Sequence, residues 1–284
     1  MKNSCIVLEG GGLRGAFTAG VLEFLLEQDI EFDRVVGVSA GACVGASYIS
    51  KQKGRNQKVN VDLPSDKRYM GFSHLIKTGS YFNMEFVFDE IPNRLVPFDE
   101  QTFYENSAEF DVVTTSLSTG ESVVFTRNDY KKFSLNKALV ASSSIPLLAQ
   151  PVKIEEKFYF DGGVSDSIPV KYALDKHDKV VVVLTRPRGY RKEKMSNKLI
   201  YQIAFRKYPK FLKTLLNRNL SYNETLDYCD QMEKEGKLYI IAPSPEFVIS
   251  RTEKDFGKRM SFFNHGKEMM QREIQQVIKF LSTP

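Results

Sequence analysis

The chain has 284 residues, of which 42% are hydrophobic and 26% are charged. These fractions are typical of folded globular proteins and exclude a collagenous, disordered or coiled-coil chain. The longest apolar runs fall far short of the roughly 20 residues that a membrane-spanning helix needs, and the apolar stretch Cys5 to Leu8 is too short for the core of a secretory signal. We therefore predict a cytoplasmic protein with no transmembrane helix.

Positive charge is concentrated in one segment. The formal net charge is +5, yet residues 186–223 hold eleven Lys and Arg residues and a single acid, Glu193. The rest of the chain is net acidic, so the basic character is local. The three cysteines and three histidines show neither paired nor metal-ligand spacing. No disulfide, metal ion or cofactor is predicted.

The first residues alternate between strand and helix patterns. Short apolar runs at 5–8 and 34–38 suit buried parallel strands, and helical periodicity follows each of them, at 16–28 and 40–51. This β-α-β-α order is typical of an α/β fold with a doubly wound, mostly parallel sheet. The polar stretch 51–68 is predicted to be a loop or insertion.

The rest of the chain continues this pattern and then becomes helical. We predict a hairpin of strands 110–116 and 122–126, a helix at 135–142, and strands at 157–160, 180–184 and 237–242. Pro209 should divide a helical stretch, and Ser221-x-x-Glu224 fits a capping box that begins a helix. We divide the chain into an α/β region, 5–185, and a mainly helical region, 186–284, packed on it.

Three consecutive glycines follow the first strand, in Gly10-Gly11-Gly12-Leu13-Arg14-Gly15. This G-x-G-x-x-G pattern also occurs in dinucleotide-binding sites, which place an acidic residue at the end of the second strand. Here that strand ends in Ser39, and Asp33 precedes it. The same glycines could form an oxyanion hole, because their backbone can turn N–H groups toward a negative oxygen near a helix N-terminus. Both an anion or nucleotide cradle and an oxyanion hole stay open.

The second strand runs into Gly37-Val38-Ser39-Ala40-Gly41, followed by a helix of small residues. This is the G-x-S-x-G pattern of a nucleophile elbow, in which Gly37 and Gly41 relieve crowding where the chain doubles back. We predict that Ser39 is a nucleophile. The competing interpretation is a serine that only caps the helix after it.

A serine hydroxyl needs a base to become nucleophilic at neutral pH. His177 and His265 fit the chain order of an α/β-hydrolase, although one lies in a charged run and the other in a helical region. Asp161 is a further candidate, because it ends a predicted strand at the side where α/β sheets carry their sites. It could equally belong to an ordinary turn with Gly162-Gly163.

Four motifs together resemble, in type and order, the sequence blocks of patatin-like phospholipases. They are the glycine loop 10–15, the elbow 37–41, Ala141-Ser142-Ser143-Ser144-Ile145-Pro146 and Asp161-Gly162-Gly163-Val164-Ser165-Asp166. The resemblance covers about residues 5–185 and is greatest to bacterial members with an extra C-terminal helical region. Many members have Asp-Gly-Ala where this chain has Asp161-Gly162-Gly163.

This resemblance implies a three-layer α/β/α fold of the patatin type and a catalytic dyad of Ser39 and Asp161 without histidine. It also implies that the glycine loop, Gly10 to Gly15, donates hydrogen bonds to the oxyanion. The expected activity is hydrolysis of fatty-acyl ester bonds in phospholipids or lysophospholipids. A histidine-dependent esterase and a non-catalytic anion- or nucleotide-binding protein are the alternatives.

The basic segment has an amphipathic pattern. Between residues 198 and 220 the apolar side chains fall on one helical face and Arg206, Lys210 and Lys213 on the opposite face. Such a helix can lie on an anionic membrane surface, or it can pack on the protein with its charges in water. We expect an acyl lipid substrate and peripheral contact with the inner membrane surface through 186–223. No nucleic-acid-binding motif accompanies the charge, so no nucleic-acid partner is predicted.

Overall fold

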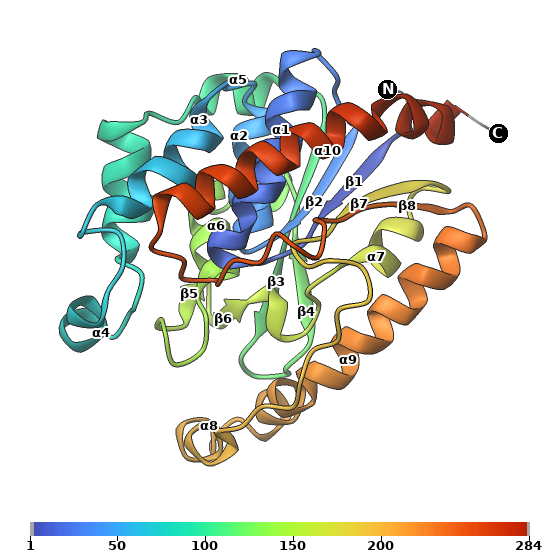
Figure 1. Cartoon of the computed structure of the whole chain (residues 1–284). Helices are drawn as coiled ribbons and strands as arrows, with labels where there is room; N and C mark the ends of the chain where they lie inside the picture. The colour runs from blue at the N-terminus through green and yellow to red at the C-terminus, as the bar shows by residue number, and fades with distance from the viewer. Residues whose placement is uncertain (1–2, 283–284) are drawn as a thin grey trace.

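A computed structural model describes residues 3–282 of the chain and contains one eight-stranded sheet (Figure 1). The strands are β1 (Cys5–Leu8), β2 (Arg34–Val38), β3 (Glu109–Ser116), β4 (Ser122–Phe125), β5 (Val152–Ile154), β6 (Lys157–Asp161), β7 (Val180–Val183) and β8 (Leu238–Ile241). Followed through their hydrogen-bonded pairs, the strands run in the order β5-β6-β3-β2-β1-β7-β8. β4 pairs with the other edge of β3, opposite both β2 and β6.

The centre of the sheet is parallel, and one side of it is antiparallel. β1 pairs in parallel with β2 and β7, β2 with β3, and β7 with β8. β4 and β6 run antiparallel to β3, and β5 runs antiparallel to β6. The strand order reverses at β1, from which β2 and β7 lead away in opposite directions. This reversal is the switch point at which open α/β sheets form their binding crevice.

Helices cover both faces of the sheet, which confirms the α/β prediction (Figure 1). The helices are α1 (Gly15–Glu27), α2 (Ala40–Ile49), α3 (Arg55–Gln57), α4 (Phe72–Thr78), α5 (Glu100–Glu105), α6 (Leu135–Ser143), α7 (Val170–Leu174), α8 (Lys198–Ala204), α9 (Pro209–Lys234) and α10 (Phe256–Ser282). Short 3-10 or π-helical turns are η1 (Gly12–Arg14), η2 (Lys58–Asp62), η3 (Leu63–Ser65), η4 (Phe86–Leu95), η5 (Asp129–Lys131) and η6 (Gly162–Val164).

The alternation of side chains along each strand divides the core into two layers. Ile6 and Leu8 of β1 pack with α1, α2, α6 and α10 on one face of the sheet. Cys5 and Val7 of the same strand pack with α7 and α9 on the other face. The C-terminal region contributes to both layers and also adds β8 to the edge of the sheet beside β7. No helix within residues 3–282 combines the length and apolar character needed to cross a bilayer.

Two local predictions are wrong. The segment 51–68, predicted as a loop, forms the helical turns α3, η2 and η3, because Asn56, Asn60 and Val61 are buried in it. Ser221, predicted to begin a helix, lies inside α9, which runs without interruption from 209 to 234. The break at Pro209 is confirmed, since this residue begins α9 after α8 has ended.

Candidate active site

Ser39 lies on the sharp turn between β2 and α2, in a strained conformation. Its φ of 54° and ψ of −123° are rare for a residue with a side chain. A Cβ at position 41 would collide with the carbonyl oxygen of Leu8, and one at position 37 would collide with the backbone of Ala42. Gly37 and Gly41 are therefore required by close packing, as a nucleophile elbow demands.

A hydrogen-bond relay from α6 holds the elbow. The Ser39 N–H donates to the Ser142 hydroxyl oxygen at 2.8 Å, and the Ser142 hydroxyl donates to the Val113 carbonyl of β3 at 2.6 Å. The Ser142 side chain is fully buried. The sequence singled out the motif 141–146 but assigned no role to Ser142, because a relay between α6 and β2 leaves no local signal.

Asp161 lies next to Ser39 because two strands meet end to end on the same edge of β3. The last residue of β2, Val38, pairs with Val113, and Asp161, the last residue of the antiparallel strand β6, pairs with Thr114. The C-terminal ends of β2 and β6 therefore reach adjacent positions of β3 from opposite directions. The serine and the aspartate, 122 positions apart in sequence, come together at this junction.

The Asp161 carboxylate is buried and hydrogen-bonded. It is 7% exposed, accepts the Gly163 N–H at 2.7 Å, and lines the same pocket as Ser39. Burial raises the pKa of Asp161, while the positive charge of Arg218 and the hydrogen bonds from Ser39 and Gly163 oppose that rise. The net effect is a carboxylate that is more basic than an ordinary aspartate.

Three residues of the glycine loop with unpaired backbone amides lie at the same site. Gly10, Gly11 and Gly12 line a pocket with Ser39, and within residues 3–282 their N–H groups have no hydrogen-bond acceptor. The Leu13 N–H donates to the Arg251 carbonyl at 2.9 Å, and the Arg14 N–H donates to the Gly11 carbonyl. Of the six residues 10–15, the first three therefore offer free donors.

Glu9 fixes the start of this loop. Its buried carboxylate accepts the Thr185 N–H at 2.6 Å, the Thr185 hydroxyl at 3.0 Å and the Tyr222 hydroxyl at 2.6 Å. These bonds join the end of β1 to the end of β7 and to α9. Three donors to one carboxylate stabilise a charged group at a position where an unpaired charge would be costly.

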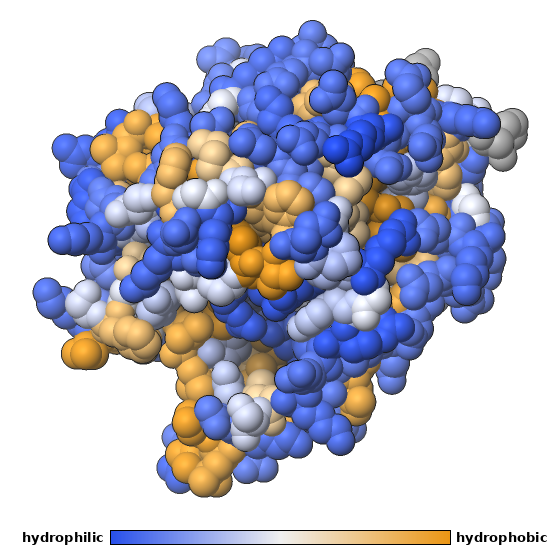
Figure 2. All heavy atoms as spheres, in the orientation of Figure 1, coloured by the Kyte–Doolittle hydropathy of each residue, from blue (hydrophilic) through white to orange (hydrophobic). Residues whose placement is uncertain are grey.

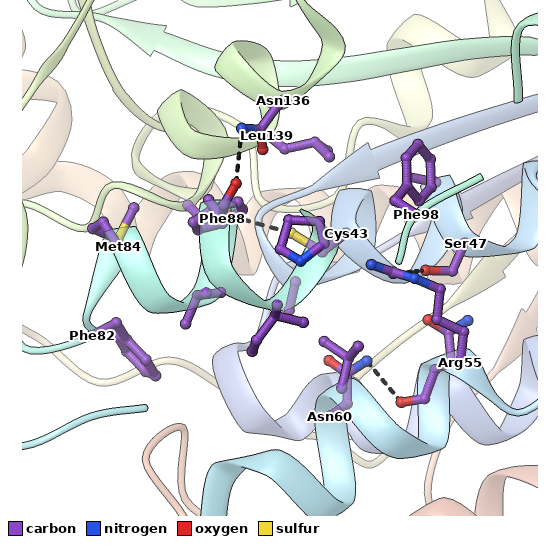
Figure 3. A pocket seen from close by; sticks show the side chains of 18 of the residues that line it. Cys43, Ser47, Arg55, Asn60, Phe82, Met84, Phe88, Phe98, Asn136 and Leu139 are labelled. Carbon is purple, nitrogen blue, oxygen red and sulfur yellow. Dashed lines mark hydrogen bonds between the residues drawn. The ribbon is translucent and has the colours of Figure 1, made fainter. Parts of the chain in front are cut away.

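Ser39 also lines a largely apolar cavity of about 480 Å³, part of whose lining is seen in Figure 3. Its walls come mainly from α2, η4 and α6, and its apolar lining includes Leu13, Phe82, Met84, Phe88, Phe98 and Leu139. Two polar side chains in the wall are bonded to the protein. Arg55 donates to the Ser47 hydroxyl at 2.6 Å, and Asn136 donates to the Phe88 carbonyl at 2.9 Å (Figure 3).

A second, smaller pocket of about 70 Å³ shares Gly12, Ser39 and Ile145 with the first. Its lining is basic, because Arg14, Arg218 and Arg251 take part in it beside Asp161. The sequence did not single out Arg251, and it treated Arg218 as one of many charges in the basic segment. Ser39 therefore lines both an apolar cavity and a basic pocket.

Neither candidate histidine lines either pocket in the described chain. His177 interacts electrostatically with Asp33 and Arg34, which lie at the start of β2, the opposite end of that strand from Ser39. His265 stacks on the Phe247 ring with 3.9 Å between centroids and accepts the Ser244 N–H. In residues 3–282 no three His, Cys, Asp or Glu side chains form a group able to hold a metal ion.

The fold and the elbow define an α/β protein that carries a serine at the switch point of its sheet, beside an aspartate and a glycine loop. The chain belongs to the patatin-like phospholipase family, whose model matches residues 6–174. A second model, described as a domain of unknown function (DUF6363), matches residues 208–282.

Relatives agree with this membership. The chain is 30% identical over 191 residues to the uncharacterized protein YjjU of Escherichia coli, and the match covers 63% of this chain and 50% of that protein. It is 26% identical over 192 residues to the probable lipid hydrolase 463L of Invertebrate iridescent virus 6, covering 61% and 64%. The match thus spans between half and two thirds of these two relatives. The fold is similar to that of VipD from Legionella pneumophila, with a TM-score of 0.57, 13% identity, and coverage of 97% of this chain and 67% of VipD.

Proposed function

We propose that the protein is a serine acyl hydrolase that cleaves fatty-acyl ester bonds of phospholipids or lysophospholipids. The observation that carries this proposal is a serine on a strained elbow that lines one pocket with a buried aspartate and also lines a largely apolar cavity. Membership in the patatin-like phospholipase family and the relative described as a probable lipid hydrolase support the same reaction class.

Ser39 is the nucleophile and Asp161 the base in this proposal. Asp161 accepts the proton of the Ser39 hydroxyl as the oxygen attacks the ester carbonyl carbon, and it returns the proton to the alcohol that leaves. Water then attacks the acyl-enzyme with the same base and frees the fatty acid. The raised pKa of Asp161 favours this role, because proton transfer is most effective when the pKa of the base lies near the working pH.

The amides of Gly10, Gly11 and Gly12 hold the oxyanion in this proposal. They are unpaired donors in the described chain and lie beside Ser39, as an oxyanion hole requires. Leu13, Arg14 and Gly15 support the loop instead of donating, since the Leu13 and Arg14 amides already have acceptors. The apolar cavity takes the acyl chain, and its volume is within the range of ligand pockets, about 300 to 1,000 Å³.

Helix α8 supports the proposal that the basic segment contacts the membrane. It has no buried residue, and Leu199, Ile200 and Ile203 are more than half exposed. Figure 2 shows these apolar side chains gathered at the lower edge of the molecule, over α8. Tyr201 of the same helix lines the basic pocket. An α8 seated on the inner membrane surface would bring Ser39 close to its substrate.

The test is hydrolysis of p-nitrophenyl esters of increasing acyl length by the wild type, Ser39→Ala and Asp161→Asn, each checked for folding by circular dichroism. We expect both variants to lose nearly all turnover and the wild type to prefer long chains. A fluorophosphonate should label the wild type and not Ser39→Ala. Turnover that survives Ser39→Ala would refute the assignment of the nucleophile. His177→Ala and His265→Ala serve as controls that should retain activity.

A further inference from the structure

Three arginines line the smaller pocket beside Ser39, and two further cations interact with them electrostatically. Arg14, Arg218 and Arg251 line the smaller pocket together with Ser39 and Asp161. Arg186 and Lys192 lie within electrostatic reach of these arginines. We use the name basic pocket for the smaller pocket together with these five side chains. Arg14 and Arg218 are held in place by the fold, since Arg14 is 8% exposed and Arg218 donates through Nε to the Gly163 carbonyl.

The protein neutralises these charges only in part, through the more distant attraction of Glu9 and Asp161. Within residues 3–282, none of the five takes part in an ion pair, whereas three exposed arginines, Arg68, Arg188 and Arg191, all do. The carboxylate of Glu9 is occupied by three hydrogen bonds, and that of Asp161 belongs to the dyad. Burying cations without an opposite charge is costly. A cluster of this kind suits an anionic ligand.

The cations also repel one another. Burial and the charges of Arg218, Arg14 and Arg251 lower the pKa of Lys192 to about 7, against the opposing attraction of Glu9. Burial and the neighbouring Arg186 lower the pKa of Arg14 to about 10, and its Nε has no hydrogen-bond partner. A bound dianion would relieve both effects, since it restores the stability of the charged forms.

We propose that the basic pocket binds the phosphate of the substrate and selects acyl glycerophospholipids whose phosphate carries no cationic base. This inference rests on the acyl-hydrolase function proposed above. The scissile carbonyl must lie at Ser39, and the acyl chain fills the apolar cavity. The alcohol half of the ester, which carries the phosphate in a glycerophospholipid, then enters the basic pocket, which Ser39 also lines. Arginine is well suited to phosphate because its guanidinium can donate two parallel hydrogen bonds to two phosphate oxygens.

The same arrangement disfavours choline and ethanolamine headgroups. Their ammonium would enter a region of net positive charge. A quaternary ammonium usually binds within a cage of several aromatic rings, whereas, within residues 3–282, the lining of the smaller pocket offers a single ring, that of Tyr201. The rings of Tyr190 and Tyr222 are already covered by Arg186 at 4.6 Å and Lys192 at 4.1 Å. An unmasked phosphate, as in lysophosphatidate, matches the pocket better.

Most of the basic pocket comes from outside the matched patatin segment. Arg14 belongs to residues 6–174, whereas Arg186, Lys192, Arg218 and Arg251 follow that range. Two of them, Arg218 and Arg251, lie within residues 208–282, the region matched by the domain of unknown function. The inference thus gives the C-terminal region a role in choosing the substrate headgroup.

The test compares kcat/KM for lysophosphatidate and lysophosphatidylcholine of one acyl length, in the wild type and in Arg251→Gln. Arg251 is suited to this because its exposed side chain forms no hydrogen bond or ion pair in the described chain. We expect the wild type to prefer lysophosphatidate and Arg251→Gln to reduce that preference about 10- to 100-fold, the value of one charge-assisted hydrogen bond. Arg251→Lys should retain part of it. Arg206→Gln, which removes the same charge from an exposed site outside both pockets, should keep the wild-type preference. A preference equal in Arg251→Gln and wild type would overturn the inference.

A binding measurement separates this inference from the proposed function. Calorimetry with inorganic phosphate on Ser39→Ala, and on Ser39→Ala combined with Arg251→Gln, does not depend on turnover. Phosphate binding that is lost in the double variant supports the anion site even if no ester is hydrolysed, in which case the acyl-hydrolase function alone fails. Binding that is absent or equal in the two proteins overturns the site. Arg251-dependent phosphate binding together with equal turnover of the two lipids overturns the headgroup assignment and indicates a site for free phosphate.

Discussion

Replacing Ser142 by alanine should loosen the nucleophile elbow while leaving both dyad residues in place. The change removes the acceptor of the Ser39 N–H, which lies at 2.8 Å in a buried environment. A buried donor left without a partner costs about 1 to 3 kcal/mol. The unusual backbone conformation of Ser39 stores a further ~1 to 3 kcal/mol of strain that this bond helps to hold. We expect the free energy of unfolding to fall by about 2 kcal/mol and kcat to fall at least tenfold, because the elbow can relax away from Asp161.

Urea denaturation followed by circular dichroism measures the stability, since the chain has no tryptophan for fluorescence. Ser144→Ala is the matched control. Ser144 is 1% exposed, in the same motif, but its hydroxyl donates at 2.8 Å to the Val140 carbonyl in the last turn of the preceding helix, α6. That loss should cost under about 1 kcal/mol. Equal destabilisation by the two variants, or full turnover in Ser142→Ala, would refute the reasoning that Ser142 holds the elbow.

Three further predictions concern charge and backbone. Because burial raises the pKa of Asp161, its ionised form lowers folded-state stability above the unfolded pKa of about 3.9. In urea titrations, Asp161→Asn should therefore be more stable than wild type at pH 8 and should lose that advantage toward pH 4. The variant should have no turnover. A lower stability of Asp161→Asn than of wild type at pH 8 would contradict this. Lys192, with a pKa of about 7, should lose its charge between about pH 6 and 8, so calorimetry should show sulfate affinity falling over that range. Lys192→Arg should flatten this dependence, and an unchanged slope would speak against it. Gly12→Ala places a Cβ 2.6 Å from the Arg251 carbonyl at a φ of +57° and should reduce neutral-ester turnover about 100-fold. Gly54→Ala, at a φ of +76° with nothing within 4 Å, controls for backbone strain alone, and equal losses in the two variants would contradict the role of the loop.

The fold and the main motifs could be predicted because their signals are local. The valines of β7 are all buried, and such a run of β-branched residues indicates a strand covered on both faces. The elbow glycines are recognisable because they flank Ser39 at a fixed spacing, although only the contact that requires Gly37 is local, with Ala42, whereas Gly41 packs against Leu8 of β1. The hairpin of β3 and β4 follows from alternation around a turn.

Other parts of the site depend on contacts between distant segments. Ser39 and Asp161 come together because β2 and β6 meet end to end on β3, a register that neither strand encodes alone. The helical turns in 51–68 have a polar sequence, yet contacts with Arg259, nearly 200 residues away, stabilise them. Arg259 donates to the Val61 carbonyl at 3.0 Å and to the Ser65 hydroxyl at 2.7 Å. No sequence pattern near residues 51–68 or near Arg259 predicts this contact.

Arg251 links the two halves of the site, since it acts on each through a different part of the residue. Its carbonyl accepts the Leu13 N–H at 2.9 Å and lies against Gly12, so its backbone helps set the shape of the loop that we propose holds the oxyanion. Its side chain lines the basic pocket beside Ser39. A phosphate bound by that side chain would restrict the segment around Arg251, and through it the glycine loop. Headgroup binding would then improve the geometry for the transition state as well as the affinity for the substrate, because binding energy remote from the reacting bond is used to position catalytic groups. On this reasoning a correct headgroup raises kcat and not only the affinity, and the C-terminal region takes part in the chemistry without contributing to the dyad.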